Sequence, residues 1–164
     1  VRQAGGHIGL ESGPGGTTFR VHLPVTPASA GAPVRVRDAR EQVRGDETVL
    51  LVEDEPAVRA LMQRVLRSLG YLVLTASEGR EALAVAAAHP GTIHLLLTDL
   101  VMPEMGGLEL AEALVALRPE TRVLVCSGYA GDPDLGSRRH ALLPKPYSPG
   151  LLAQRVRETL DAVR

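Results

Sequence analysis

The feature that most constrains this chain is an alternation of short apolar runs with amphipathic helical patterns, which repeats along the sequence after Asp46. Five apolar runs have the length of strands, and they cover residues 48–52, 71–75, 93–98, 122–127 and 141–143. Strands that alternate with helices along a chain pair in parallel and leave helices on both faces of the sheet. The sequence therefore predicts an α/β fold with a doubly wound sheet of five parallel strands.

Helical patterns separate these runs, and their ends carry recognisable signals. Apolar residues recur every three or four positions over residues 56–69, 81–88, 108–117 and 149–160. Pro56 is suited to the first turn of the first helix, and Gly70 to the position just after its end. Ser148 followed by Pro149 predicts a capped start for the last helix. Residues 132–140 contain a proline and a glycine, so only a short or irregular element is expected there.

The N-terminal part of the sequence predicts a separate organisation. Residues 1–24 contain two strand-like runs joined by a glycine-rich connection, which indicates a β-hairpin. A two-stranded hairpin is marginally stable by itself, so we expect it to be the remnant of a larger sheet. Residues 25–46 are rich first in proline and alanine and then in mixed charges without periodicity, which is typical of a linker. We therefore expect one folded domain over residues 47–164.

Charge and apolar content exclude several classes of partner. The formal net charge of -1 gives no electrostatic reason to expect nucleic acid or an anionic membrane surface as a partner. No apolar run approaches the roughly 18 to 20 residues that a membrane span requires. The single cysteine, Cys126, has no partner for an internal disulfide, which fits a reducing, cytoplasmic setting. We expect a cytoplasmic segment that contacts neither nucleic acid nor membrane.

Charged side chains follow three of the predicted strands at the point where each strand ends. Glu53 and Asp54 follow the first strand, Asp99 ends the third, and Lys145 follows the fifth. Ligands of open parallel sheets bind outside the carboxyl ends of the strands, so these groups should converge there. Three neighbouring carboxylates repel one another unless a cation neutralises them. The oxygen ligands favour Mg²⁺ as that cation.

Within this cluster Asp99 is the candidate nucleophile. A carboxylate with a reference pKa of about 3.9 is ionised at neutral pH and can attack phosphorus without a general base. Lys145 and the metal ion would stabilise charge on the phosphoryl oxygens during transfer. The hydroxyl of Ser127, at the end of the fourth predicted strand, could donate a hydrogen bond to one of these oxygens. The chemistry that this pattern predicts is phosphoryl transfer to Asp99.

Four segments in this order resemble the response regulator receiver family, whose members share a CheY-like fold. They are residues 51–55, 99–103, 126–130 and 145–147. The resemblance covers the chain from Glu47 to its C-terminus and implies a flavodoxin-like strand order of 2-1-3-4-5. It also implies two-component phosphorelay signalling, with a histidine kinase or a histidine phosphotransfer domain as partner, in cis or in trans.

The resemblance implies a set of ligands for Mg²⁺. Asp54 and Asp99 would bind the ion, Glu53 would act largely through water, and Val101 would contribute its backbone carbonyl. The family more often has aspartate where Glu53 stands, and glutamate keeps the charge on an arm that is one methylene longer. We therefore expect metal binding to survive this difference.

The resemblance also assigns the groups that handle the phosphoryl group. It implies Asp99 as the phosphoacceptor, Ser127 as the switch hydroxyl and Lys145 as the lysine that pairs with the phosphoryl group. Leu142 stands three residues before Lys145, where many receivers have an aromatic that turns inward on phosphorylation. We therefore expect the aromatic half of that switch to be absent.

The predicted hairpin carries a second resemblance. Residues 5–8 and 16–24 resemble the last two strands of a histidine-kinase ATP-binding domain, which implies a hybrid histidine kinase as the parent protein. The segment lacks the phosphorylatable-histidine and nucleotide-binding motifs of such kinases, so we do not expect it to bind ATP. The catalysis that we expect of this chain is the phosphorylation of its own Asp99. The sequence does not decide whether the chain is to be classed as an enzyme.

Two other functions fit parts of the pattern. A receiver-like module that is not phosphorylated would act only by binding proteins, and a weak affinity for Mg²⁺ would distinguish it. A phosphatase with an aspartyl-phosphate intermediate usually needs a second carboxylate two residues after the nucleophile, where Val101 stands. The sequence favours a phosphorylated receiver over both.

Overall fold

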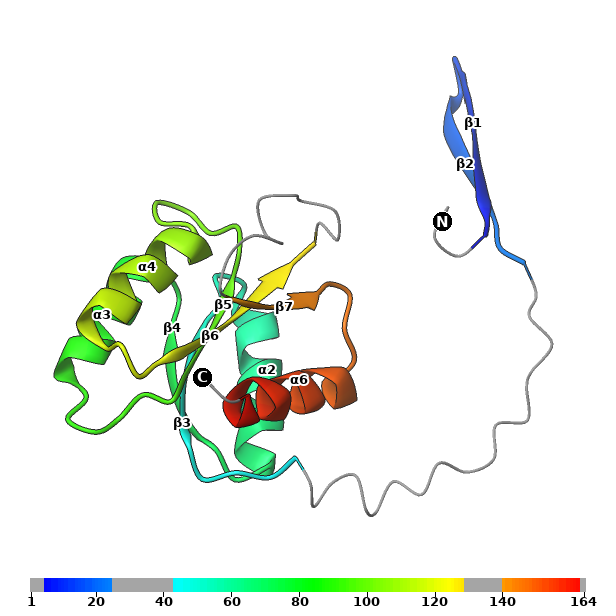
Figure 1. Ribbon diagram of the computed structural model, residues 1–164. Coiled ribbons are helices and arrows are strands. Elements are labelled where there is room, and N and C mark those ends of the chain that lie inside the picture. The colour runs from blue at the N-terminus through cyan, green and yellow to red at the C-terminus, as the bar shows by residue number, and fades with distance from the viewer. Residues whose placement is uncertain (1–4, 25–42, 129–139, 163–164) are drawn as a thin grey trace, which may run out of the picture. The chain divides into compact units, whose positions relative to one another are not determined.

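The computed structural model describes residues 5–24, 43–128 and 140–162 of the chain (Figure 1). It divides into two compact units, Val1–Val36 and Arg37–Arg164. None of the helices within the described ranges combines the length and the hydrophobicity that crossing a membrane requires. Most of the predicted linker and of the irregular stretch over residues 132–140 lies outside the described residues, so those two expectations stay predictions.

The first unit contains the predicted hairpin. Strand β1, His7–Gly13, pairs antiparallel with strand β2, Gly16–His22. The register places Ile8 opposite Val21 and Leu10 opposite Phe19, and all four of these side chains are more than half exposed. Positions two apart in a strand share a face, so these four residues form one apolar face of the hairpin.

The second unit is built on a five-stranded sheet whose neighbouring strands are all parallel, with the order β4-β3-β5-β6-β7. The strands are β3 (Thr48–Val52), β4 (Leu72–Ala76), β5 (Leu95–Asp99), β6 (Arg122–Ser127) and β7 (Ala141–Pro144). Numbered along this unit alone, this is the predicted order 2-1-3-4-5, which is confirmed. The order reverses between β3 and β5, where parallel sheets place their ligand sites.

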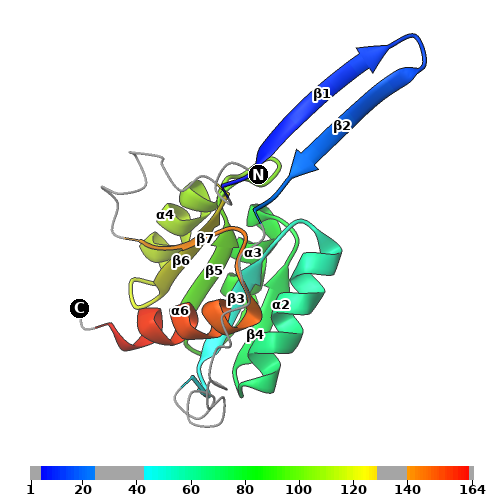
Figure 2. The same cartoon turned by 90° about the vertical axis from the view of Figure 1, so that its right-hand side faces the viewer.

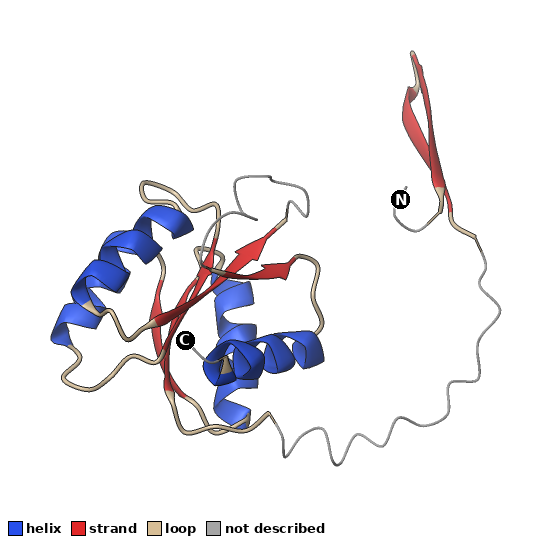
Figure 3. Cartoon of the chain, viewed as in Figure 1, coloured by secondary structure: helices blue, strands red, loops and turns tan. Residues whose placement is uncertain are grey.

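Helices cover both faces of this sheet (Figures 2 and 3). They are α2 (Pro56–Ser68), α3 (Gly79–Ala88), α4 (Gly107–Leu117) and α6 (Pro149–Asp161). Val49 and Leu51 of β3 pack in the core beneath α2 and α6, whereas Leu50 and Val52 pack in the core beneath α3 and α4. Alternate residues of β3 are covered on the two faces, so the strand is buried throughout and apolar after Thr48, as expected for a doubly wound sheet.

Local signals in the sequence explain where several elements begin. Ser148 caps α6, because its hydroxyl oxygen accepts a hydrogen bond from the backbone N–H of Leu151 at 3.2 Å. The third predicted strand starts two residues later than expected, at Leu95, although the backbone of His94 still bonds to Thr48 and Arg122 of the neighbouring strands. Nδ1 of His94 accepts the backbone N–H of Thr48 at 3.0 Å, which makes this histidine a structural residue.

The last residues before β3 are fixed to the body of the second unit. The hydroxyl of Tyr71 donates to the carbonyl of Val43 at 3.1 Å, and the N–H of Gly45 donates to the carbonyl of Leu69 at 3.2 Å. The guanidinium of Arg157, on α6, forms an ion pair with Glu47 at 2.7 Å. These contacts join the start of the unit to its last helix at the amino ends of the strands.

We predict that Gly70→Ala destabilises the second unit. Gly70 has φ +102°, and a Cβ atom there would lie 2.5 Å from the carbonyl oxygen of Gly45. Both the backbone conformation and the contact disfavour any side chain, so we expect the free energy of unfolding in urea to fall by about 1–3 kcal/mol. The control is Gly106→Ala, where φ is -69° and the added Cβ would make an ordinary contact at 3.5 Å. Equal stability of the two variants would contradict the prediction.

Candidate functional site

Three carboxylates lie together at the carboxyl end of the sheet. Glu53 and Asp54 follow β3, and Asp99 ends the neighbouring strand β5. Each offers one ligand oxygen, and these oxygens lie within 4.8 Å of one another. The parallel register, which pairs Val52 with Thr98, brings the two strand ends level and so places the three side chains side by side. The structure thus brings together the carboxylates that the sequence predicts to converge.

The three carboxylates differ in their exposure to water. Glu53 is buried, with 3% of its surface exposed, whereas Asp54 is exposed and Asp99 is intermediate. Burial raises the pKa of the Glu53 carboxyl above its ordinary value, and the negative charge of Asp99 raises it further, although Lys145 opposes both effects. A carboxylate in this position is stabilised by a cation beside it.

Lys145 supplies one such cation. Its Nζ lies 2.7 Å from Oδ2 of Asp99 and 3.4 Å from Oε2 of Glu53. Burial lowers the pKa of the Lys145 ammonium, but the hydrogen bond to Asp99 and the charge of Glu53 outweigh this and raise it. The backbone N–H of Lys145 donates to the carbonyl of Ser127 at 2.7 Å, so the end of β6 holds the backbone of Lys145 in place. Lys145 therefore stays charged and directed at Asp99.

Both oxygens of the Asp99 carboxylate have hydrogen-bond donors. Oδ2 accepts from Lys145, and Oδ1 accepts the backbone N–H of Leu100 at 2.8 Å. The same N–H of Leu100 lies 2.9 Å from the carbonyl of Cys126 on β6, and this contact holds the start of the loop against the neighbouring strand. The carboxylate is thus oriented from two sides, by a side chain from one strand end and by the backbone of its own loop.

Among the residues that the structure describes, positive charge around the site does not balance the carboxylates. Arg59, on the first turn of α2, donates to the backbone carbonyls of Glu53 and Asp54 and leaves their carboxylates uncompensated. Within the described ranges, one ammonium, that of Lys145, therefore stands beside a cluster of three carboxylates. Hard oxygen donors with excess negative charge suit a divalent cation, so the residues present fit a metal ion. The sequence pattern did not identify Arg59, because its role depends on how α2 folds back over the end of β3.

The remaining predicted site residues lie at or near the same strand ends. Ser127 is buried at the end of β6, and Val101 lies two residues beyond β5 with an exposed side chain. Leu142 is half-buried against the core beneath α3 and α4, and Tyr147 is half-buried with its hydroxyl 3.4 Å from Sδ of Met62. Tyr129, which belongs to one of the predicted motifs, lies outside the described residues.

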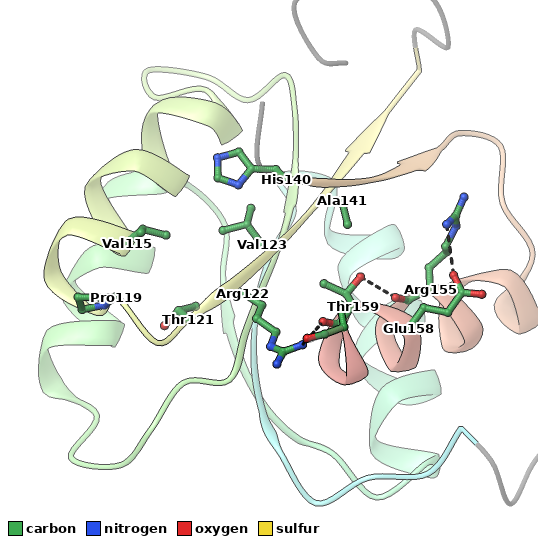
Figure 4. Close-up of a pocket in the computed structure, with 11 residues that line it drawn as sticks. Val115, Pro119, Thr121, Arg122, Val123, His140, Ala141, Arg155, Glu158 and Thr159 are labelled. Atoms are coloured by element: carbon green, nitrogen blue, oxygen red, sulfur yellow. Dashed lines mark hydrogen bonds and ion pairs between the residues drawn. The ribbon is translucent and has the colours of Figure 1, made fainter. Parts of the chain in front are cut away.

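A separate hollow of about 770 Å³ lies at the amino ends of β6 and β7, beside α4 and α6 (Figure 4). Its polar lining is engaged in internal contacts. Arg122 donates to the carbonyl of Thr159 at 2.7 Å, and Arg155 pairs with Glu158 at 3.2 Å. The acidic cluster lies at the carboxyl ends of the strands, so this hollow is not part of the candidate site.

Comparison with known proteins agrees with this geometry. The profile of the response regulator receiver domain matches residues 49–157. The chain is 37% identical to the sensor kinase CckA of Brucella abortus in an alignment 173 positions long. This alignment covers 98% of this chain and 18% of that protein. The crystal structure of the receiver domain from the hybrid histidine kinase CckA matches with 38% identity and a TM-score of 0.61, over 70% of this chain and 99% of that domain.

A further similar structure is the response regulator TrrA of Thermotoga maritima in complex with Mg²⁺ and BeF. It is 26% identical, with a TM-score of 0.59, over 69% of this chain and 98% of that protein. The chain thus spans nearly all of the compared receiver structures but only 18% of the length of the full sensor kinase.

We predict that Asp54→Asn stabilises the second unit when divalent cations are removed by a chelator. The change removes one of three negative charges that lie within 4.8 Å, and relief of this repulsion at an exposed site is about 1 kcal/mol. Urea unfolding measures the difference. The matched control is Glu55→Gln, because the Glu55 carboxylate lies at the start of α2, where negative charge is favourable. A loss of stability in Asp54→Asn as large as in the control would show that the carboxylates do not repel.

Proposed function

The chain belongs to the response regulator receiver domain family, and from this membership we propose that Asp99 accepts a phosphoryl group from a phosphohistidine during phosphorelay signalling. The observation that carries the proposal is the setting of Asp99. Its carboxylate lies 2.7 Å from the Lys145 ammonium and within 4.8 Å of ligand oxygens from Glu53 and Asp54. A reactive carboxylate, a fixed ammonium and an acidic pair together provide what phosphoryl transfer onto aspartate requires.

In the proposed reaction an oxygen of Asp99 attacks the phosphorus atom of the phosphohistidine. A P–O bond forms, the P–N bond breaks, and the departing imidazole keeps the electron pair of that bond and takes up a proton. Lys145 then pairs with an oxygen of the phosphoryl group, because its ammonium already lies beside the Asp99 carboxylate. Ser127, at the end of β6, donates its hydroxyl hydrogen to a second phosphoryl oxygen.

Mg²⁺ is the cofactor that we propose for this site. Glu53, Asp54 and Asp99 would hold it, together with the backbone carbonyl of Val101. When bound, the ion neutralises negative charge on the phosphoryl oxygens. Two observations support this choice: the excess of carboxylates over cations among the described residues of the site, and the similarity to a response regulator whose structure contains Mg²⁺ and BeF.

We further propose that this segment lies in the cytoplasm, and that the parent protein is a hybrid histidine kinase or a protein served by one in trans. The alignment with the sensor kinase CckA covers 98% of this chain, so it includes the hairpin as well as the receiver domain. The hairpin exposes four apolar side chains, those of Ile8, Leu10, Phe19 and Val21, on one face. Such a face is stable when another layer covers it, and the rest of a kinase ATP-binding domain would supply that layer. The partners would be the kinase histidine or a histidine phosphotransfer domain.

The first test of this proposal is phosphorylation by acetyl phosphate. We expect one base-labile phosphoryl group per chain in the presence of Mg²⁺, detected by intact-protein mass spectrometry, and none after chelation of the metal. Asp99→Asn should abolish the signal because it removes the nucleophile, whereas Asp46→Asn, an exposed aspartate at the opposite end of the sheet, should leave it unchanged.

Phosphate on Asp99→Asn would disprove the assignment of the nucleophile. An unmodified but folded wild-type chain would instead favour the alternative function, a receiver-like module that only binds proteins. The affinity for Mg²⁺ then adds a second criterion, because a module of that kind has no need of a metal site.

The second test uses the full parent protein and ATP that is labelled on its γ-phosphate. If the parent is a hybrid kinase, the label should reach Asp99 by way of a phosphohistidine. In Asp99→Asn the label should therefore stop at the acid-labile phosphohistidine. A parent protein that incorporates no label from ATP would contradict the hybrid-kinase proposal and leave the acetyl phosphate result unaffected.

A further inference from the structure

We propose that Gly107 is a positioning residue for Asp99, because the backbone of the aspartate occupies the space that any side chain at position 107 would need. Gly107 is the first residue of α4 and is buried. A Cβ atom there would lie 2.0 Å from the carbonyl oxygen of Asp99 and 3.0 Å from its carbonyl carbon. This proposal rests on the proposed function of Asp99. It assigns to Gly107 the role of keeping the Asp99 carboxylate in its position.

The close approach is part of a closed loop between β5 and α4. The backbone N–H of Gly107 donates to the carbonyl of Leu100 at 3.0 Å, so the loop returns to the strand end from which it started. The Cα of Leu100 would lie 3.2 Å from the added Cβ. A side chain at position 107 therefore pushes on two consecutive residues of the loop, and neither can yield as a flexible side chain would.

Displacement of this backbone would reach both hydrogen bonds of the Asp99 carboxylate. The Leu100 N–H that donates to Oδ1 belongs to the same peptide group as the Asp99 carbonyl, so it moves when that carbonyl is displaced. Lys145 approaches Oδ2 from another strand and does not follow the movement of β5. Asp99 would then shift relative to Lys145 and to the other two carboxylates. Mutation of a residue that orients a metal ligand typically lowers metal affinity or activity by about 10- to 100-fold.

Helix propensity alone predicts the opposite effect. Alanine is more favourable than glycine within a helix, so Gly107→Ala would be expected to favour folding if space were not limiting. The neighbouring Gly106 shows the contrast, because its added Cβ would make only an ordinary 3.5 Å contact with the carbonyl of Leu100. Two adjacent glycines of the same loop thus differ in whether the Asp99 backbone excludes a side chain.

The experiment compares Gly107→Ala, Gly106→Ala and Gly70→Ala with the wild type. Two quantities are measured at a temperature at which circular dichroism shows each variant folded: the dissociation constant for Mg²⁺ alone by calorimetry, and the rate of phosphorylation by acetyl phosphate. We expect Gly107→Ala to weaken Mg²⁺ binding and to slow phosphorylation by about tenfold or more. Gly106→Ala should stay close to the wild type in both.

Gly70→Ala is the control for lost stability, because it is expected to destabilise the unit at the end of the sheet opposite Asp99. A positioning role predicts normal Mg²⁺ binding and phosphorylation in this variant, once folded. If Gly107→Ala does not fold, the measurements are repeated with trimethylamine N-oxide, which favours the compact state.

Gly107→Ala with the Mg²⁺ affinity and rate of the wild type would overturn the inference. So would an equal loss of both in Gly70→Ala, which would trace the effect to stability. These outcomes are distinct from failure of the proposed function, in which the wild-type chain itself is not phosphorylated on Asp99.

Discussion

Mutual repulsion among Glu53, Asp54 and Asp99 is the constraint on which the rest of this domain depends. Their ligand oxygens lie within 4.8 Å of one another, and one of the side chains is buried, so the arrangement is unfavourable without a cation. It is held by parallel strands whose apolar residues are covered on both faces, which prevents the strand ends from moving apart. Folding thus maintains an anionic site of the kind that the proposed metal ion and phosphoryl group would require.

The two ends of the sheet have different tasks. The carboxyl ends carry the reactive groups, and their backbone contacts serve to orient Asp99 and Lys145. The amino ends carry packing and ion-pair contacts, among them the pair between Arg157 and Glu47. This division explains why a destabilising change at Gly70 and a displacing change at Gly107 should have different consequences, although both are glycines in tight contact with backbone.

Much of the fold and of the site follows from local patterns in the sequence. Apolar runs and helix signals were sufficient for a doubly wound sheet of five parallel strands, whereas the strand order came from the family resemblance. Charged residues at strand ends were sufficient for the convergence of Asp99, Glu53 and Lys145. Details that depend on contacts between distant segments were not predictable in this way. The role of Arg59 requires the packing of α2 over the end of β3, and the demand for glycine at position 107 requires the path of a loop that returns to its own start.

The contacts at the start of the second unit anchor residues that precede its first strand. Because Tyr71 holds the carbonyl of Val43 and Arg157 holds Glu47, the chain is already anchored several residues before β3 begins. An extended residue spans at most about 3.6 Å, so each residue anchored to the domain is one that cannot add this length to a connection with the preceding part of the chain. In the proposed hybrid kinase, anchoring of the chain from Val43 onward would limit how far Asp99 could lie from a donor histidine in the same molecule. A shorter connection between two reacting groups raises their local concentration.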